Sequence, residues 1–236
     1  GEREPPARLE AERRLAREAD HLVAATPAEK AHLVWAYGAN PSRVAVIPPG
    51  VDLEHFRPIP QAEARRLLGF PPDKRYILYV GRIEPLKGIE TLIRAVAILA
   101  QECPTWTRDF AVILIGGDPE ASTDAELRRL QQLREDLGVA DLVAFIGAKA
   151  QETLPYYYNA AAVVVMPSDY ESFGLVALEA MACGRPVIAS EVGGLVYLVR
   201  HGETGLRVPR RQPVALARAL DRLLRDEALR QRMGEN

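Results

Sequence analysis

Short apolar runs rich in β-branched residues alternate along the chain with longer amphipathic stretches, and no other feature constrains the fold as strongly. Eight runs are expected to form strands: His21–Ala25, Arg43–Pro48, Tyr76–Val80, Phe110–Ile115, Leu142–Ile146, Val163–Met166, Pro186–Ser190 and Gly205–Val208. Runs that are apolar along their whole length, such as Ala111–Ile115, suit strands covered on both faces. The alternation predicts an α/β protein with a doubly wound parallel sheet.

The amphipathic stretches between these runs predict the helices. The clearest is Lys87–Ala100, whose apolar residues mark one face at helical spacing. The others are Pro27–Tyr37, Gln61–Leu68, Ala125–Leu137, Gln151–Ala160, Leu175–Cys183 and Pro213–Arg225. The helix at Leu175 has a well-marked end, because Gly184 can adopt the left-handed conformation after it and Pro186 prevents continuation.

Length and charge limit the kind of protein. A chain of 236 residues suffices for one large α/β domain and part of another. The prolines around Ile47–Asp52 mark a connection, so we expect residues 1–50 to form one part and residues 51–236 a second. The formal net charge of −2 creates no general field for nucleic acid, so any anion site must be built locally.

The apolar runs also limit membrane association. The longest of them, such as Ala160–Met166, fall far short of the ~20 residues that a membrane-spanning helix needs. The N-terminal stretch Gly1–Arg17 is highly charged and carries no apolar signal region. We therefore expect a cytoplasmic protein without a transmembrane segment, while peripheral membrane contact of a longer parent protein stays open.

The junction Val80–Gly88, between a strand and a helix, carries two glycines and two basic residues. Ligands of open parallel sheets bind where strands end and helices begin. Arg82 offers a planar fork suited to two phosphate oxygens. Lys87 is expected in the first helical turn, where it opposes the helix dipole and costs stability unless an anion joins it. The junction predicts a phosphate site, and a solvated basic pair on a surface loop is the alternative.

A second junction, Asp169–Leu175, leads into another helix. The N–H groups of Ser172–Leu175 would point along the helix axis, ready for an anion. Glu171 lies before this helix and Glu179 about one turn inside it, so the two carboxylates could accept hydrogen bonds from hydroxyls at two ends of one ligand. Glu179 stands among apolar residues, where a glutamate is rarely buried without a partner. A structural ion pair from Glu179 to Arg185 is the alternative.

Further signals are weaker or absent. Ser190–Gly194 again places glycines after a strand, which predicts either close approach to a ligand or a tight turn. Neither GxGxxG nor GxxxxGK[ST] occurs, which argues against a dinucleotide fingerprint and a P-loop. The four histidines lack metal-ligand spacing, and Asp169–Glu171 suggests a metal motif only superficially. No metal site is expected.

Several of these motifs together resemble glycosyltransferase family 4. They are Gly81-Arg82, Lys87-Gly88, the two glutamates within Glu171–Ala180, and the segment Pro48–Phe56, which is similar to the family's join between domains. The resemblance runs from about Arg13 to Arg232 and is strongest to bacterial inositol-phosphate N-acetylglucosaminyltransferases of mycothiol synthesis and to sucrose-phosphate synthases. It implies the GT-B architecture of two Rossmann-like domains facing across a cleft. Residues 51–236 would form the donor-binding domain, and residues 1–50 the end of the acceptor-binding domain.

The resemblance also implies an activity and a set of site residues. The enzyme would be a retaining transferase that takes the sugar from a nucleotide-diphospho-sugar, with a UDP-sugar expected, without a metal or other cofactor. Its catalytic residues would be Arg82 and Lys87 on the diphosphate and Glu171 on the transferred sugar, with Glu179 on the ribose. Further donor contacts would come from Gly81, Gly147, Ala148, Ser172, Phe173, Gly174 and Leu175, with Gly147 and Ala148 near the base.

The part of the family pattern that this sequence lacks leads to a further expectation. Most of the acceptor-binding domain is absent from it, and a closing C-terminal helix would lie beyond Arg232. We therefore expect the 236-residue chain to bind donor nucleotide and to transfer sugar poorly or not at all. Two alternatives remain, a sugar-nucleotide epimerase of the same architecture and a non-catalytic nucleotide-binding module. The epimerase would need acid and base groups near C2 of the sugar, and the sequence offers no evident set.

Overall fold

The computed structural model describes residues 6–103, 109–118 and 124–236, and the chain divides into two compact units, Gly1–Gly50 and Val51–Asn236. The first unit contains α1 (Pro6–Glu18), β1 (Leu22–Ala24), α2 (Pro27–Tyr37) and β2 (Val44–Val46). β1 and β2 pair in parallel over a small core that includes Ala24 and Val44. Thr26 caps α2 by accepting a hydrogen bond from the Glu29 N–H.

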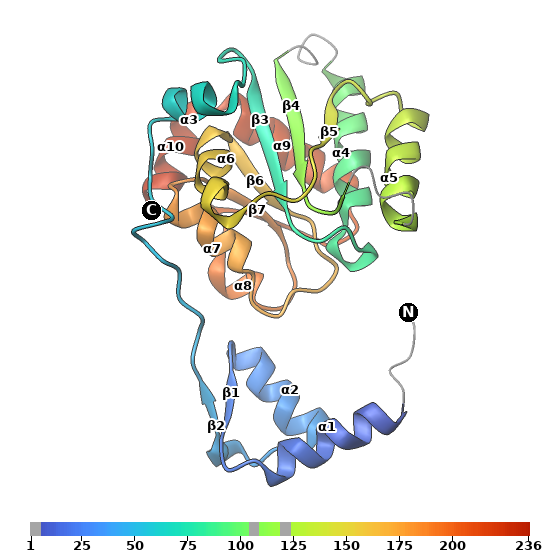
Figure 1. Ribbon diagram of the computed structural model, residues 1–236, viewed down its shortest axis with the longest axis vertical. Coiled ribbons are helices and arrows are strands. Elements are labelled where there is room, and N and C mark those ends of the chain that lie inside the picture. The colour runs from blue at the N-terminus through green and yellow to red at the C-terminus, as the bar shows by residue number, and fades with distance from the viewer. Residues whose placement is uncertain (1–5, 104–108, 119–123) are drawn as a thin grey trace. The chain divides into compact units, whose positions relative to one another are not determined.

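The second unit is built on one parallel sheet of six strands in the order β5-β4-β3-β6-β7-β8 (Figure 1). The strands are β3 (Arg75–Val80), β4 (Phe110–Ile115), β5 (Val143–Phe145), β6 (Val163–Met166), β7 (Val187–Ser190) and β8 (Gly205–Val208). The predicted doubly wound parallel sheet is therefore confirmed. The strand order reverses between β3 and β6, and in such sheets ligands bind at this switch point, beyond the carboxyl ends of the strands.

Helices cover both faces of this sheet. One face packs against α4 (Ile89–Glu102), α5 (Ala125–Asp136), α9 (Pro213–Arg225) and α10 (Glu227–Glu235). The other packs against α6 (Leu154–Ala160), α7 (Leu175–Ala182) and α8 (Leu195–Leu198), with α3 (Gln61–Leu68) beside α6. Successive residues of β3 point to opposite faces, so Ile77 joins the first core and Leu78 the second. Burial on both faces explains why the strands are apolar throughout.

The helix predicted from Lys87 begins later than expected. Pro85–Lys87 form a single 3₁₀ turn, and α4 starts at Ile89 after Gly88 in the left-handed conformation (φ 68°). Lys87 therefore precedes the helix, and its prediction in the first helical turn is wrong. The reason is that a left-handed glycine interrupts the helical hydrogen-bond ladder at this point.

Three α-helices among the described residues were not predicted from the sequence. α1 and α10 are rich in charged residues, and α8 is a single turn. Each lacks the long apolar stripe that identifies a helix in a sequence.

Candidate functional site

The two loops at the switch point lie in direct contact. Gly88 approaches the β6–α7 loop so closely that a Cβ built on it would lie 2.0 Å from the Pro167 carbonyl oxygen. The Asp169 N–H also donates a hydrogen bond of 2.8 Å to the Leu86 carbonyl. Only glycine combines this close approach with the left-handed backbone of Gly88. The first and second predicted junctions, Val80–Gly88 and Asp169–Leu175, are therefore in direct contact with each other.

Lys87 and Glu171 form an ion pair across these loops. Lys87 Nζ lies 2.7 Å from Glu171 Oε2, and the two side chains are only 20% and 14% exposed. An ion pair so shielded from water is stronger than one on the open surface, and losing either partner leaves a poorly solvated charge. The structure therefore brings together two of the three predicted catalytic residues.

Arg82 lies on the same loop in a different environment. Its guanidinium Nη1 lies 2.7 Å from Glu84 Oε1, and its side chain is 75% exposed. Its backbone is fixed, because the buried Tyr79 hydroxyl donates a hydrogen bond of 2.8 Å to the Arg82 carbonyl. Burial, with the charges of Glu171 and Glu84, raises the pKa of Tyr79, so this hydroxyl stays protonated and can donate. The Arg82 side chain can therefore reorient on a fixed anchor.

The N-terminus of α7 follows Glu171 in the same loop. Gly174 is its N-cap at φ 105°, and the N–H groups of Ala177 and Leu178 donate to the Gly174 carbonyl. The leading N–H groups of a helix have no intrahelical partners and carry partial positive charge. Phe173 is buried beside this turn, whereas Ser172 and Leu175 are exposed. The turn can therefore receive an anion next to the Lys87–Glu171 pair.

The glycines of the third junction, Gly193 and Gly194, pack against the backbone of the loop that carries Glu171. A Cβ on Gly193 would lie 1.8 Å from the Glu171 carbonyl oxygen, and the Gly194 N–H donates to that same oxygen at 3.0 Å. A Cβ on Gly194 would lie 2.4 Å from Phe173 Cα. The close approach predicted here exists, but the group approached is the backbone of the protein's own loop.

Glu179 is bonded to a tyrosine. The Tyr158 hydroxyl donates a hydrogen bond of 2.6 Å to Glu179 Oε2. Tyr158 is fully buried, and burial together with the Glu179 charge raises its pKa, so it remains a donor. The position of the Glu179 carboxylate is therefore set from within the core.

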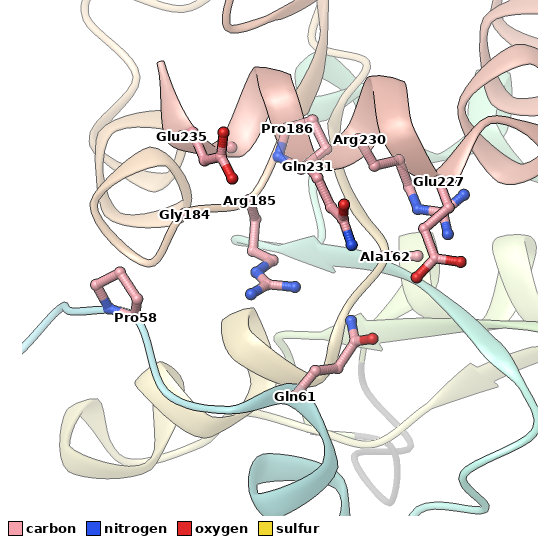
Figure 2. A pocket seen from close by; sticks show the side chains of 11 residues that line it. Pro58, Gln61, Ala162, Gly184, Arg185, Pro186, Glu227, Arg230, Gln231 and Glu235 are labelled. Carbon is pink, nitrogen blue, oxygen red and sulfur yellow. The ribbon is translucent and has the colours of Figure 1, made fainter.

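Arg185 lies elsewhere, so the alternative of a Glu179–Arg185 ion pair is wrong. Figure 2 shows Arg185 pointing into a cavity of about 470 Å³ between α10 and α3. It donates to the Cys183 carbonyl at 3.3 Å and to the Ala161 carbonyl at 3.5 Å. This cavity borders Ala162 and Pro186, which precede β6 and β7. It is at the opposite edge of the sheet from the switch point.

Gly147 and Ala148 lie at the carboxyl edge of the sheet, in the turn that follows β5. The Gly147 carbonyl accepts a hydrogen bond from Gly116 at 3.1 Å, and the Ala148 N–H donates to Gly117 at 2.8 Å. A Cβ on Gly116 would in turn lie 1.8 Å from the Gly81 carbonyl oxygen. The loops after β5, β4 and β3 are thus linked in series. All the predicted donor-site residues lie in loops at the carboxyl edge of the sheet or in α7.

Two further properties bear on the expectations from the sequence. Within residues 6–103, 109–118 and 124–236, no three His, Cys, Asp or Glu side chains gather as a metal site would need. No helix in the described part of the chain has the length and apolar character required to cross a bilayer.

Comparison with known proteins follows the division of the chain into two parts. Residues 60–236 match the family model described as glycosyl transferases group 1, and residues 2–55 match that of glycosyltransferase family 4. D-inositol 3-phosphate glycosyltransferase from Streptomyces bingchenggensis is 48% identical over 232 residues, which are 98% of this chain and 51% of that protein. The chain spans about half the length of the curated relatives it matches.

Solved structures give a consistent result. Sucrose-phosphate synthase from Thermosynechococcus elongatus matches with a TM-score of 0.88 and 42% identity, over 99% of this chain and 56% of that one. HepE from Anabaena, solved in complex with UDP and glucose, matches with a TM-score of 0.85 and 27% identity, over 98% of this chain and 60% of that one. With its Rossmann-like sheet of the GT-B type and a family match over residues 60–236, the chain belongs to the group 1 glycosyltransferases.

Proposed function

We propose that the chain is the donor-binding part of a retaining glycosyltransferase and that it binds a nucleotide-diphospho-sugar, with UDP as the nucleotide. The sugar would be transferred to an acceptor hydroxyl. The observation that carries this proposal is the shielded Lys87–Glu171 pair at the switch point, next to the N-terminus of α7. UDP and glucose in the structure of the Anabaena relative support the choice of nucleotide.

Each charged group has a distinct proposed role. Lys87 would share its ammonium between Glu171 and the diphosphate, and Arg82 would leave Glu84 to bind the same diphosphate. Positive charge held there stabilises the negative charge that develops on the departing nucleotide, which lowers the barrier to transfer. The leading amides of α7, with those of Phe173 and Gly174, would line the phosphate and the sugar.

The two glutamates would bind hydroxyl groups. Glu171 would accept a hydrogen bond from the transferred sugar, and Glu179 would accept hydrogen bonds from the ribose. The Tyr158 hydroxyl would hold Glu179 in place, which reduces the entropy lost when the ribose binds. Backbone groups around Gly147 and Ala148 would lie near the base.

The activity of the whole protein belongs to the same proposal. Acceptor binding would reside in the other half of the length seen in the relatives, so the 236-residue chain alone would transfer sugar poorly or not at all. The proposed reaction needs no metal, because Arg82, Lys87 and the start of α7 would supply the positive charge. The two free cysteines support a cytoplasmic location, where thiols stay reduced.

Calorimetric titration of the chain with UDP, ADP and GDP tests donor binding. We expect UDP to bind, and Arg82→Ala and Glu179→Ala each to weaken binding by about 1.5–3 kcal/mol through the loss of charged hydrogen bonds. Arg218→Ala, at an exposed position of α9, is the control with the same change in charge as Arg82→Ala and should have no effect. Absence of nucleotide binding in both the chain and a full-length protein that contains it would contradict the proposal.

The reaction itself can be tested on a full-length protein that contains this chain, with a labelled UDP-sugar. Transfer with retention of configuration at the anomeric carbon is the expected result. Epimerised sugar nucleotide without transfer would favour the epimerase alternative, and binding without any chemistry would favour the non-catalytic module.

A further inference from the structure

Asp169 connects three loops at the switch point. Its N–H donates to the Leu86 carbonyl at 2.8 Å, next to Lys87 in sequence. Its carboxylate Oδ2 accepts hydrogen bonds from Nε and Nη2 of Arg211, at 2.7 and 2.6 Å. Arg211 belongs to the loop between β8 and α9. Since Asp169 is two residues before Glu171, it joins the segments that carry both members of the Lys87–Glu171 pair to a third element.

Arg211 holds this contact in an unfavourable backbone conformation. Its φ is 56°, and it is the one non-glycine residue with positive φ in the described part of the chain. A residue with a Cβ adopts this conformation only at an energetic cost. The conformation therefore persists only where surrounding contacts enforce it. The Arg211 side chain is 69% exposed, so burial does not enforce it. In this conformation the Arg211 guanidinium contacts Asp169.

The geometry at Asp169 is not the best available for an ion pair. Asp169 is 8% exposed, and its second oxygen, Oδ1, is buried without a hydrogen-bond partner. A bidentate pair would engage both oxygens with the two nitrogens of the guanidinium. The backbone carbonyl of Asp169 also accepts a hydrogen bond from Arg210 at 3.4 Å. The backbone and the side chain of Asp169 are therefore both bonded to the β8–α9 loop, through Arg210 and Arg211.

We propose that Asp169 and Arg211 form a clasp that sets the positions of Lys87 and Glu171 for the diphosphate of the donor. Asp169 is a positioning residue in this proposal: it acts through the backbone of both loops without touching the ligand. Arg211 anchors it to the β8–α9 loop. The inference rests on the proposed donor function and assigns to it two residues that the family resemblance did not name.

Arg211→Gly separates positioning from stability. Glycine adopts φ 56° without strain, and this relief offsets the loss of an exposed ion pair. We therefore expect a melting temperature within about 2 °C of the parent chain. Calorimetry should show UDP binding weakened about tenfold, because Lys87 and Glu171 lose their fixed separation.

Three comparisons keep this test specific. Arg200→Gly removes an arginine that is 74% exposed and pairs with Glu203 at 3.7 Å in the loop before β8, and it should leave UDP affinity unchanged. UMP lacks the second phosphate, so its affinity should be the same for the parent chain and for Arg211→Gly. Asp169→Asn retains the backbone bonds and one side-chain oxygen, and its loss of UDP affinity should be smaller than that of Arg211→Gly.

The outcomes are distinguishable. Unchanged UDP affinity in Arg211→Gly would overturn the clasp while leaving the donor function intact. An equal loss for UMP and UDP, or a fall in melting temperature that accounts for the loss, would show that Arg211 serves only the structure. Absence of nucleotide binding in the parent chain would remove the donor function and the clasp together.

Discussion

Lys87 and Arg82 lie five positions apart on one loop, yet they differ in exposure and in the origin of their ion-pair partners. Lys87 is 20% exposed and pairs with Glu171 from another loop, whereas Arg82 is 75% exposed and pairs with Glu84 from its own. A shielded contact between two loops restricts both of them. An exposed contact within one loop is weak and easily exchanged for water or ligand.

The difference divides the proposed donor site into a fixed part and an adaptable part. Lys87, Glu171 and Glu179 are held by protein contacts, and so they would lose little freedom on binding a ligand. Arg82 would have to leave Glu84 and become ordered, so part of its proposed binding energy would be spent on that change. Substitutions in the fixed part should therefore cost more affinity than those in the adaptable part.

Separating the two loops at the switch point should have the largest effect. Gly88→Ala would place a Cβ 2.0 Å from the Pro167 carbonyl, in a left-handed conformation, and one loop must move. We expect a loss of about 3 kcal/mol or more in the free energy of unfolding, measured by urea denaturation, and no measurable UDP binding.

A matched glycine isolates the contribution of the close approach. Gly69 has nearly the same φ, 67° against 68° for Gly88, but no atom lies within 4 Å of its added Cβ. Gly69→Ala should cost only about 1 kcal/mol in stability, from backbone strain alone. It should not affect UDP binding, and equal losses for the two variants would contradict the tight contact between the loops.

Glu179 tests the fixed part at the ribose. Glu179→Gln should weaken UDP binding by about 2 kcal/mol, because a charged acceptor of the ribose hydroxyls is replaced by a neutral one. The parent chain should bind UDP more tightly than 2′,3′-dideoxy-UDP, and calorimetry should show that Glu179→Gln has lost this preference. A variant that still discriminates between the two nucleotides would place the ribose elsewhere.

Arg82 tests the adaptable part. Arg82→Ala should weaken UDP binding by about 1.5 kcal/mol, at the lower end for a charged hydrogen bond, because Arg82 first leaves Glu84. The loss should shrink as salt is added, since exposed charges are screened. Thermal denaturation should show unchanged stability, and a clear fall in melting temperature would show that Arg82 is part of the fixed structure.

Releasing Arg82 should have the smallest effect. Glu84→Gln removes its partner in the ligand-free protein, and exposed ion pairs contribute about 0.2–1 kcal/mol. UDP affinity measured by calorimetry should therefore rise by no more than about fivefold. Weaker binding in this variant would mean that Glu84 holds Arg82 in its binding position.

The sequence predicted the fold well because strand burial leaves a local signal. Each of the eight apolar runs coincides with a strand to within one or two residues at either end. Residues of β3 and β4 are apolar on both faces because helices cover both. The helix start at Lys87 was wrong, since the left-handed conformation of Gly88 depends on its contact with Pro167, a residue far away in sequence.

The candidate site was predicted as motifs, without the contacts that join them. Arg82, Lys87 and Glu171 were identified from junctions of strand and helix. The Tyr158 bond to Glu179 and the Arg211 bond to Asp169 were missed, because their partners lie 21 and 42 positions apart. Their residue types alone indicate packing or a solvated charge, and only the fold brings them together.

Titration of the parent chain and of Lys87→Met with UDP and UMP tests the central claim most directly, because the two nucleotides differ only in the second phosphate. We predict that the parent chain binds UDP at least about tenfold more tightly than UMP, the contribution of one charged hydrogen bond. Lys87→Met should lose most of this preference and bind UMP as the parent does. If Lys87→Met kept the affinity and preference of the parent, Lys87 would not bind the diphosphate, and the switch point would not be the donor site.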